Sequence, residues 1–173
     1  MNLINFTGID CRRGVLLLVF IAFISLSSNA QSTPALKIPD FTFYKMDGKS
    51  FSKKDLTKSK KMVIIFFDVT CDHCQNEIKA VSDRIEEFKK AEFYLVSMDN
   101  VLGMQLFMKR YAPKMNGRAN VTLLKDLNRE FIPRFMPVQY PATFVYGVDG
   151  RLIKYFGQNS KIADIVRTVN QGK

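Results

Sequence analysis

The sequence of 173 residues has no tryptophan, a single histidine and only three cysteines. One histidine excludes zinc sites that need two imidazole ligands, and three cysteines exclude a four-cysteine site within one chain. The large core side chains must therefore come from the 15 phenylalanines and 6 tyrosines. Because 47% of the residues are hydrophobic and 24% are charged, the composition is that of a folded protein, and the length suits one domain.

Acidic residues are scarce, since 16 Asp and Glu stand against 26 Lys and Arg, which gives a formal net charge of +10. Such an excess can indicate nucleic-acid binding, but the lysines follow no recognisable motif. We interpret them as solvated surface and predict no nucleic-acid partner. Attraction to an acidic partner or to a membrane surface is the alternative.

One long uncharged run, residues 14–26 (GVLLLVFIAFISL), follows two arginines and precedes the small residues at 28–30. The run is shorter than the ~20 residues that a membrane-spanning helix needs. Its order of charge, apolar core and small residues is typical of a secretory signal peptide. We therefore expect residues 1–30 to be cleaved near Ala30 and the protein to be exported to the periplasm or cell envelope. An uncleaved signal that tethers the protein to the membrane is the alternative.

The rest of the chain divides into a short linker and one domain. Residues 31–40 carry two prolines and little hydrophobic pattern, so we expect a linker that leads into a domain over residues 41–173. Alternation over residues 41–44 and the following Asp47–Gly48 turn predict a β-hairpin at the start of that domain.

The middle of the domain has the pattern of a βαβ unit. Residues 62–67 form an apolar run without alternation, typical of a strand covered on both faces. Apolar residues over 78–88 recur at intervals of three and four, which favours a helix, and residues 93–98 predict a parallel second strand. With a further hairpin at 142–156, these patterns predict an α/β fold whose central sheet is parallel at first and antiparallel at the end.

Two short helical segments are expected nearer the C-terminus. Residues 126–132 predict a helical turn that Pro133 ends, and Ser160 is predicted to be the N-cap of a final helix.

Removal of residues 1–30 would leave Cys71 and Cys74 as the only cysteines. A disulfide between residues this close restrains the unfolded chain very little, so a structural bridge is a poor explanation. A pair that opens and closes in an oxidising compartment explains the spacing better. The pair follows the predicted strand and begins a helix, where unpaired N–H groups and the helix dipole favour a thiolate.

The two cysteines are expected to have different roles. Cys71, the outer one, would attack a disulfide in a partner, and Cys74 would then resolve the mixed disulfide. Between them, a protonated His73 would favour ionisation of Cys71, whereas Asp72 would oppose it. A copper site formed by Cys71, Cys74 and His73 lacks a distal ligand at a diagnostic spacing, and zinc would have to be shared between two chains. We therefore predict no metal and no other cofactor.

Pro141 follows Tyr140 immediately before the strand predicted at 142–146. A proline cannot donate a hydrogen bond to a sheet, so the start of a strand suits it. A cis Tyr140–Pro141 bond would leave the backbone of Tyr140 free to pair with an incoming peptide. An ordinary trans proline in a loop is the alternative, and the residues alone favour it.

Together these features resemble the thioredoxin superfamily, and within it the exported TlpA, ResA and DsbE-type thiol-disulfide oxidoreductases. The similarity covers residues 36–170 and is carried by the signal peptide, the Asp47–Gly48 hairpin, KMVIIFFDVTCDHCQ (61–75) and YPATFVYGVDGRLI (140–153). The resemblance implies a thioredoxin-like fold with a central mixed β-sheet flanked by helices and an N-terminal β-hairpin extension. It implies that Cys71 attacks, that Cys74 resolves, and that Tyr140 and a cis Pro141 bind the substrate beside the dithiol.

The chain departs from this family at two positions. Thr70 stands where the family usually has a tryptophan, and Ile65 stands where thioredoxin has a buried aspartate. The acid that would exchange a proton with Cys74 is therefore not identified. Asp68 is a nearby candidate, although an exposed capping role suits it better.

The sequence thus predicts an exported enzyme that exchanges disulfides with exported proteins, as a reductant rather than an oxidant. A thiol donor in the membrane or periplasm would recharge it. The alternatives are a copper-binding chaperone of thioredoxin fold, a redox-inert interaction domain, and a peroxiredoxin-like peroxidase, which would want threonine where this chain has Asp68.

Overall fold

The computed structural model describes residues 33–88 and 90–171. The predicted signal peptide, residues 1–30, lies outside these ranges. Within them, no helix has the length and apolar character needed to cross a membrane.

Part of the segment expected to be a linker is in contact with the domain. The N–H of Ala35 donates to the carbonyl of Phe135 at 3.0 Å, and Lys37 forms an antiparallel bridge with Arg151. Ile38 is buried in the core. Ordered packing of the domain therefore reaches back to Ala35.

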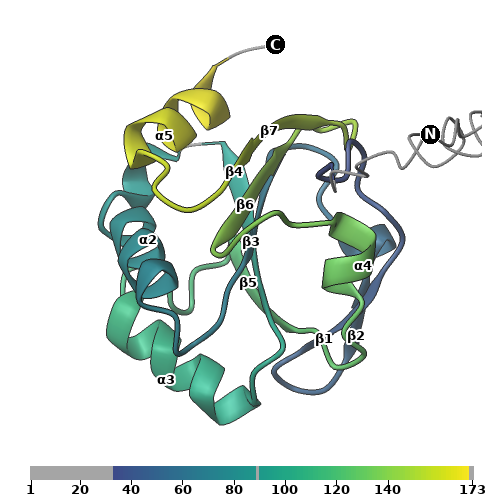
Figure 1. Cartoon of the computed structure of the whole chain (residues 1–173), viewed down its shortest axis with the longest axis vertical. Coiled ribbons are helices and arrows are strands. Elements are labelled where there is room, and N and C mark those ends of the chain that lie inside the picture. Colours follow the sequence, from purple (N-terminus) through teal and green to yellow (C-terminus); the bar gives the residue numbers. More distant parts are fainter. Residues whose placement is uncertain (1–32, 89, 172–173) are drawn as a thin grey trace, which may run out of the picture. The chain divides into compact units, whose positions relative to one another are not determined.

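In the described ranges the strands form one seven-stranded sheet with the order β2-β1-β5-β4-β3-β6-β7 (Figure 1). The strands are β1 (Thr42–Lys45), β2 (Ser50–Ser52), β3 (Lys61–Phe66), β4 (Ala91–Ser97), β5 (Val121–Lys125), β6 (Ala142–Tyr146) and β7 (Leu152–Phe156). Strands β3, β4 and β5 are parallel, and the hairpins β1–β2 and β6–β7 are antiparallel. The predicted mixed sheet with an N-terminal hairpin is confirmed.

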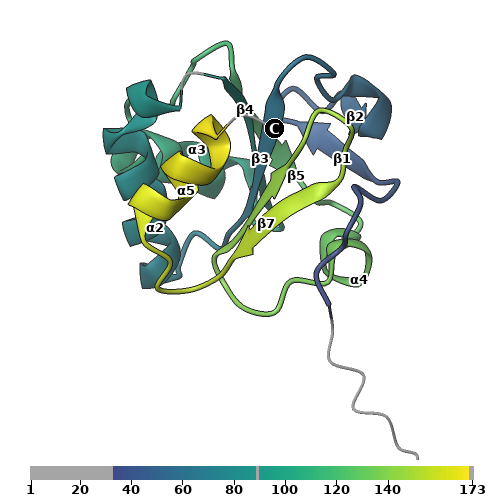
Figure 2. The same ribbon diagram turned by 90° about the horizontal axis from the view of Figure 1, so that it is seen from above.

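Helices cover both faces of the sheet. The helices are α2 (Asp72–Asp83), α3 (Val101–Tyr111), α4 (Phe131–Phe135) and α5 (Ile162–Asn170), with 3₁₀ turns at Lys53–Asp55 and Ile85–Glu87. Figure 2 shows α2, α3 and α5 on one face and α4 on the other. Because both faces are covered, every residue of β3 after Lys61 is buried, as its unbroken apolar sequence predicts.

Two predicted helix boundaries are wrong. Pro133 does not end a helical turn but lies inside α4 at its third residue, where its missing N–H would have had no intrahelical partner. The turn begins later than predicted because the buried Asp126 carboxylate accepts the N–H groups of Glu130 and Phe131 at 2.9 and 2.8 Å. At the last helix the N-cap is Lys161, and the Ser160 hydroxyl donates instead to the Gly157 carbonyl.

Stacked phenylalanines join α4 to the end of β3. The Phe131 ring lies between Phe66 and Phe135, with centroid distances of 4.2 and 4.3 Å and interplanar angles of 6°. Phe66 is the last residue of β3, five positions before Cys71, so this stack supports the strand end from which the loop to the two cysteines departs.

We expect Phe131→Ala to lower the free energy of unfolding by about 3–5 kcal/mol, because it removes a fully buried ring from this stack. Urea denaturation measures the change. The neighbouring Ile132 is 40% exposed, so Ile132→Ala is the matched control and should cost well under half as much. Equal losses in the two variants would contradict the importance of the stack.

Candidate active site

The two cysteines lie at the start of α2 and are both free thiols. Cys71 is the N-cap residue, and its sulfur accepts the N–H of Cys74 at 3.3 Å. Cys71 is half-buried, whereas Cys74 has 0% of its surface exposed. The pair therefore stands at the predicted strand-to-helix junction, with one sulfur within reach of solvent and the other enclosed.

Burial raises the pKa of the Cys74 thiol well above its usual range. A hydrogen bond with the Asp68 backbone opposes this shift, while the hydrogen bond with Cys71 and the charges of Cys71 and Asp68 add to it. Cys74 is consequently a protonated thiol at neutral pH, and it must lose that proton before it can attack a disulfide.

Asp68 holds the short loop between β3 and α2 through hydrogen bonds with Thr70 and Cys71. Asp68 Oδ1 accepts both the N–H and the hydroxyl of Thr70, at 2.7 and 2.6 Å, and the Asp68 carbonyl accepts the Cys71 N–H at 3.3 Å. Asp68 is exposed, so it has the capping role that the sequence favoured and not that of a buried acid.

Asp99, at the end of β4, is a residue that sequence reasoning did not assign to the site. Its Oδ2 accepts the N–H of Val69 at 2.9 Å and the hydroxyl of the buried Ser97 at 2.8 Å. This carboxylate ties the dithiol loop to the neighbouring strand and so fixes where Cys71 emerges.

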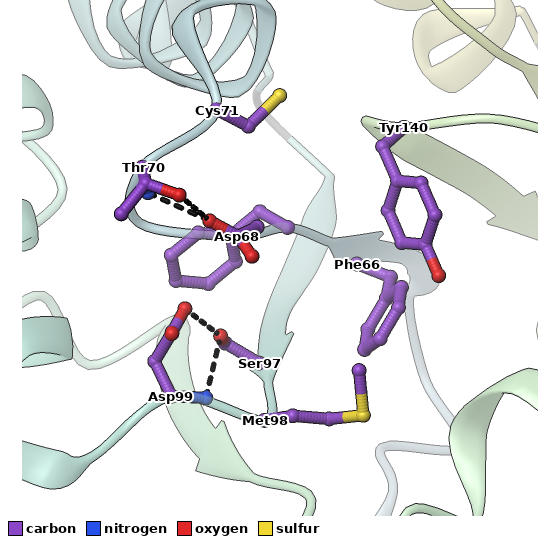
Figure 3. A pocket seen from close by; sticks show the side chains of 9 residues that line it. Phe66, Asp68, Thr70, Cys71, Ser97, Met98, Asp99 and Tyr140 are labelled. Atoms are coloured by element: carbon purple, nitrogen blue, oxygen red, sulfur yellow. Dashed lines mark hydrogen bonds between the residues drawn. The ribbon is translucent and has the colours of Figure 1, made fainter.

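A cavity of about 450 Å³ opens beside Cys71 (Figure 3). Figure 3 shows Tyr140 and Phe66 on one side of it and Thr70 on the other. Its full lining is Phe66, Phe67, Asp68, Thr70, Cys71, Ser97, Met98, Asp99 and Tyr140. Aromatic rings and a methionine thus lie beside Cys71 in this cavity, and Tyr140 is 38% exposed.

The Tyr140–Pro141 peptide bond is cis, as the resemblance implies. Pro141 is buried and lines a second cavity of about 230 Å³ together with His73 and Glu77, whereas Tyr140 lines the cavity beside Cys71. Asp72 lines neither of these two cavities. Asp72 and His73 are exposed on the first turn of α2, and their side chains make no hydrogen bond or ion pair with any residue that the structure describes.

Glu77 is the second residue that sequence reasoning missed. Burial raises its pKa to about 7, while a 2.6 Å hydrogen bond from the Thr143 hydroxyl acts in the opposite direction. Glu77 follows Cys74 by three residues along α2, and Thr143 lies in β6 just after Pro141. The contact therefore joins the helix that carries the cysteines to the strand that follows Pro141. The sequence signal for Glu77 was its position on α2, three residues after the buried Cys74 and one before the buried Ile78, which places its carboxyl group near the buried face of the helix.

Residues 34–155 match the AhpC/TSA family. Comparison with curated protein sequences gives no match. Similar solved structures include a secreted Mycobacterium tuberculosis disulfide oxidoreductase homologous to E. coli DsbE, with 22% identity and a TM-score of 0.61 over 75% of this chain and 93% of that one. Arabidopsis thaliana ScoI with copper bound has 16% identity and a TM-score of 0.61, covering 80% of this chain and 100% of that one. A peroxiredoxin-like protein from Aquifex aeolicus has 15% identity and a TM-score of 0.63, covering 79% and 85%. These likenesses confirm the predicted thioredoxin-like fold.

We expect the stability of the protein to fall as the pH rises from about 4.5 to about 7, and then to level off as far as Glu77 is concerned. The unfolded chain releases the Glu77 proton near the ordinary value of 4.5, whereas the folded protein holds it to about 7. Glu77→Gln keeps the acceptor for Thr143 but has no charge to bury. Urea denaturation should therefore show this variant more stable than the wild type at pH 8, by about 1–3 kcal/mol, with a smaller gain at pH 5.

Glu86→Gln is the matched control, because the Glu86 side chain is 80% exposed. It should show no such gain between pH 5 and pH 8. An equal gain in both variants, or none in Glu77→Gln, would show that the Glu77 carboxylate is not destabilised by burial.

Proposed function

The chain belongs to the AhpC/TSA family, and we propose that it is a thiol-disulfide oxidoreductase that exchanges disulfides with protein clients through Cys71 and Cys74. The observation that carries this proposal is the unequal burial of the two sulfurs on one helix turn. Cys71 borders a cavity and is half-buried, while Cys74 is enclosed. One sulfur can meet a partner, and the other can react only from inside the protein.

In the first step the Cys71 thiolate attacks one sulfur of a client disulfide. The client S–S bond breaks, a new S–S bond joins Cys71 to the attacked sulfur, and the other client sulfur leaves as a thiolate. The N–H of Cys74, which donates to the Cys71 sulfur, and the N-terminus of α2 both favour negative charge on that sulfur before it reacts.

In the second step Cys74 loses its proton and attacks the Cys71 sulfur of the mixed disulfide. A Cys71–Cys74 bond forms, and the client sulfur held by Cys71 leaves as a thiolate. The client disulfide has then gained two electrons and the dithiol has lost two. Because Cys74 is a buried thiol whose pKa is raised, it does not compete with Cys71 for the client in the first step.

A client segment would lie along the cavity beside Cys71 and pair with the backbone of Tyr140. Three apolar side chains, those of Phe66, Met98 and Tyr140, would contact its residues next to the disulfide. Apolar and flexible walls suit a binding site that accepts clients of varied sequence.

The net direction proposed is reduction of exported proteins, with an external thiol donor returning the Cys71–Cys74 disulfide to the dithiol.

Export rests on the signal-peptide pattern of residues 1–30 and is supported by the likeness to the secreted Mycobacterium tuberculosis oxidoreductase. N-terminal sequencing of the protein recovered from the cell envelope should give Gln31 as the first residue. A chain that retains residues 1–30 would instead be tethered through an uncleaved signal.

Two other members of the same fold suggest different functions. Copper transfer is suggested by the ScoI likeness, but residues 33–88 and 90–171 contain no group of three His, Cys, Asp or Glu side chains arranged to hold a metal ion. Peroxide reduction is suggested by the peroxiredoxin-like protein, but Asp68 occupies the position where such enzymes want threonine. Stoichiometric Cu(I) binding without turnover, or peroxide-dependent loss of thiols, would favour these alternatives.

We expect the protein to catalyse insulin reduction by dithiothreitol, Cys71→Ser to abolish that activity, and Cys74→Ser to accumulate mixed disulfides through Cys71. Without Cys74 the second step cannot occur, so the intermediate persists. Non-reducing gels and mass spectrometry of the adducts detect it and identify the clients.

The double variant Cys71→Ser/Cys74→Ser is the control and should form no adduct. Turnover that survives Cys71→Ser, or a Cys74→Ser protein that forms no adduct in cells, would contradict disulfide exchange through this site.

A further inference from the structure

The hydroxyl of Tyr155 is bound to the loop that leads into Tyr140. It accepts the N–H groups of Val138 and Gln139, at 3.1 and 3.3 Å, and donates to the carbonyl of Gln139 at 3.4 Å. A phenol hydroxyl offers one donor and two acceptor lone pairs. Tyr155 therefore uses its full hydrogen-bonding capacity on two consecutive residues of this loop.

The sheet fixes the Tyr155 ring independently of these bonds. Tyr155 lies in β7 and pairs with Phe144 of β6, and the two rings meet edge to face at 5.0 Å and 70°. The loop, in contrast, is exposed at both residues that the hydroxyl holds. A strand of the sheet thus holds an exposed loop through the hydroxyl oxygen of Tyr155.

A second contact brings the same loop against the end of β7. The Gln139 side chain lies over the buried Gly157, so closely that a methyl group at Gly157 would overlap it. The loop is therefore fitted to β7 at two points, one through its backbone and one through a side chain.

The loop continues directly into the client side of the site. Tyr140 lines the cavity beside Cys71, and its ring lies 5.4 Å from Phe66. Tyr155 itself lies outside that cavity lining. We propose that Tyr155 is a positioning residue, which holds the 138–140 loop in the geometry that protein clients bind. The inference rests on the proposed disulfide exchange, and it assigns Tyr155 a part in client binding without a part in the chemistry at Cys71.

Tyr155→Phe tests this proposal, because it keeps the ring against Phe144 and removes only the hydroxyl. In the insulin-reduction assay the KM for insulin should rise about three- to ten-fold, while kcat stays within about two-fold of the wild type. Reduction of the small disulfide 5,5′-dithiobis(2-nitrobenzoic acid), which has no backbone to pair with the loop, should be unchanged. Amide hydrogen exchange at Val138 and Gln139 should become faster.

Tyr94→Phe is the matched control. The Tyr94 hydroxyl accepts the N–H of Thr57 at 3.0 Å, so the variant also loses a backbone hydrogen bond to a phenol, but neither residue lines the Cys71 cavity. Its KM for insulin should equal that of the wild type. A KM that is unchanged in Tyr155→Phe, or raised equally in Tyr94→Phe, would overturn the proposal.

The two proposals fail in different ways. If the wild type reduces neither insulin nor the small disulfide, the proposed function is wrong. Hydrogen exchange at Val138 and Gln139 does not depend on activity, and unchanged exchange in Tyr155→Phe would show that the hydroxyl does not hold the loop.

Discussion

The hydrogen bond from the Cys74 N–H to the Cys71 sulfur is the contact around which the site is arranged. The first turn of a helix has N–H groups without intrahelical partners, and an oxygen-bearing side chain usually caps them. Here a sulfur takes that place, so the atom that caps α2 is also the atom available to a partner. The same geometry sets Cys74 one turn inside, where burial keeps it protonated. One helix terminus therefore accounts for the exposure of one sulfur and the enclosure of the other.

The loop that delivers Cys71 to this position is held by carboxylates. Asp99 accepts the N–H of Val69, and Asp68 accepts both the N–H and the hydroxyl of Thr70. The apolar side of the cavity beside Cys71 comes from Phe66 and Tyr140. The loop is thus held by two carboxylates, and the aromatic side chains beside it come from the end of β3 and from the residue before Pro141.

Features that depend on local pattern could be predicted from the sequence, and features that depend on distant partners could not. The unbroken apolar run at residues 62–67 is a local pattern, and it predicted both the buried strand β3 and the place of Cys71 between that strand and a helix. Pro133 was misplaced because a carboxylate at Asp126, several residues earlier, decides where α4 begins. Glu77 was missed because its hydrogen-bond partner, Thr143, lies 66 positions away, and the spacing along α2 does not reveal which strand will lie beside it.

The register between β3 and β6 brings these distant pieces together. Phe66 pairs with Ala142 and Ile65 with Thr143, which sets the Thr143 side chain toward α2 and the next residue, Phe144, toward the opposite face. Thr143 then reaches Glu77 on the cysteine-bearing helix, while Phe144 receives the ring of Tyr155. Because successive side chains of a strand alternate between faces, a slip of one residue would turn Thr143 and Phe144 to the opposite faces and break both contacts. The same pairing that packs the core therefore holds the cysteine-bearing helix on one face of β6 and, through Tyr155, the 138–140 loop on the other.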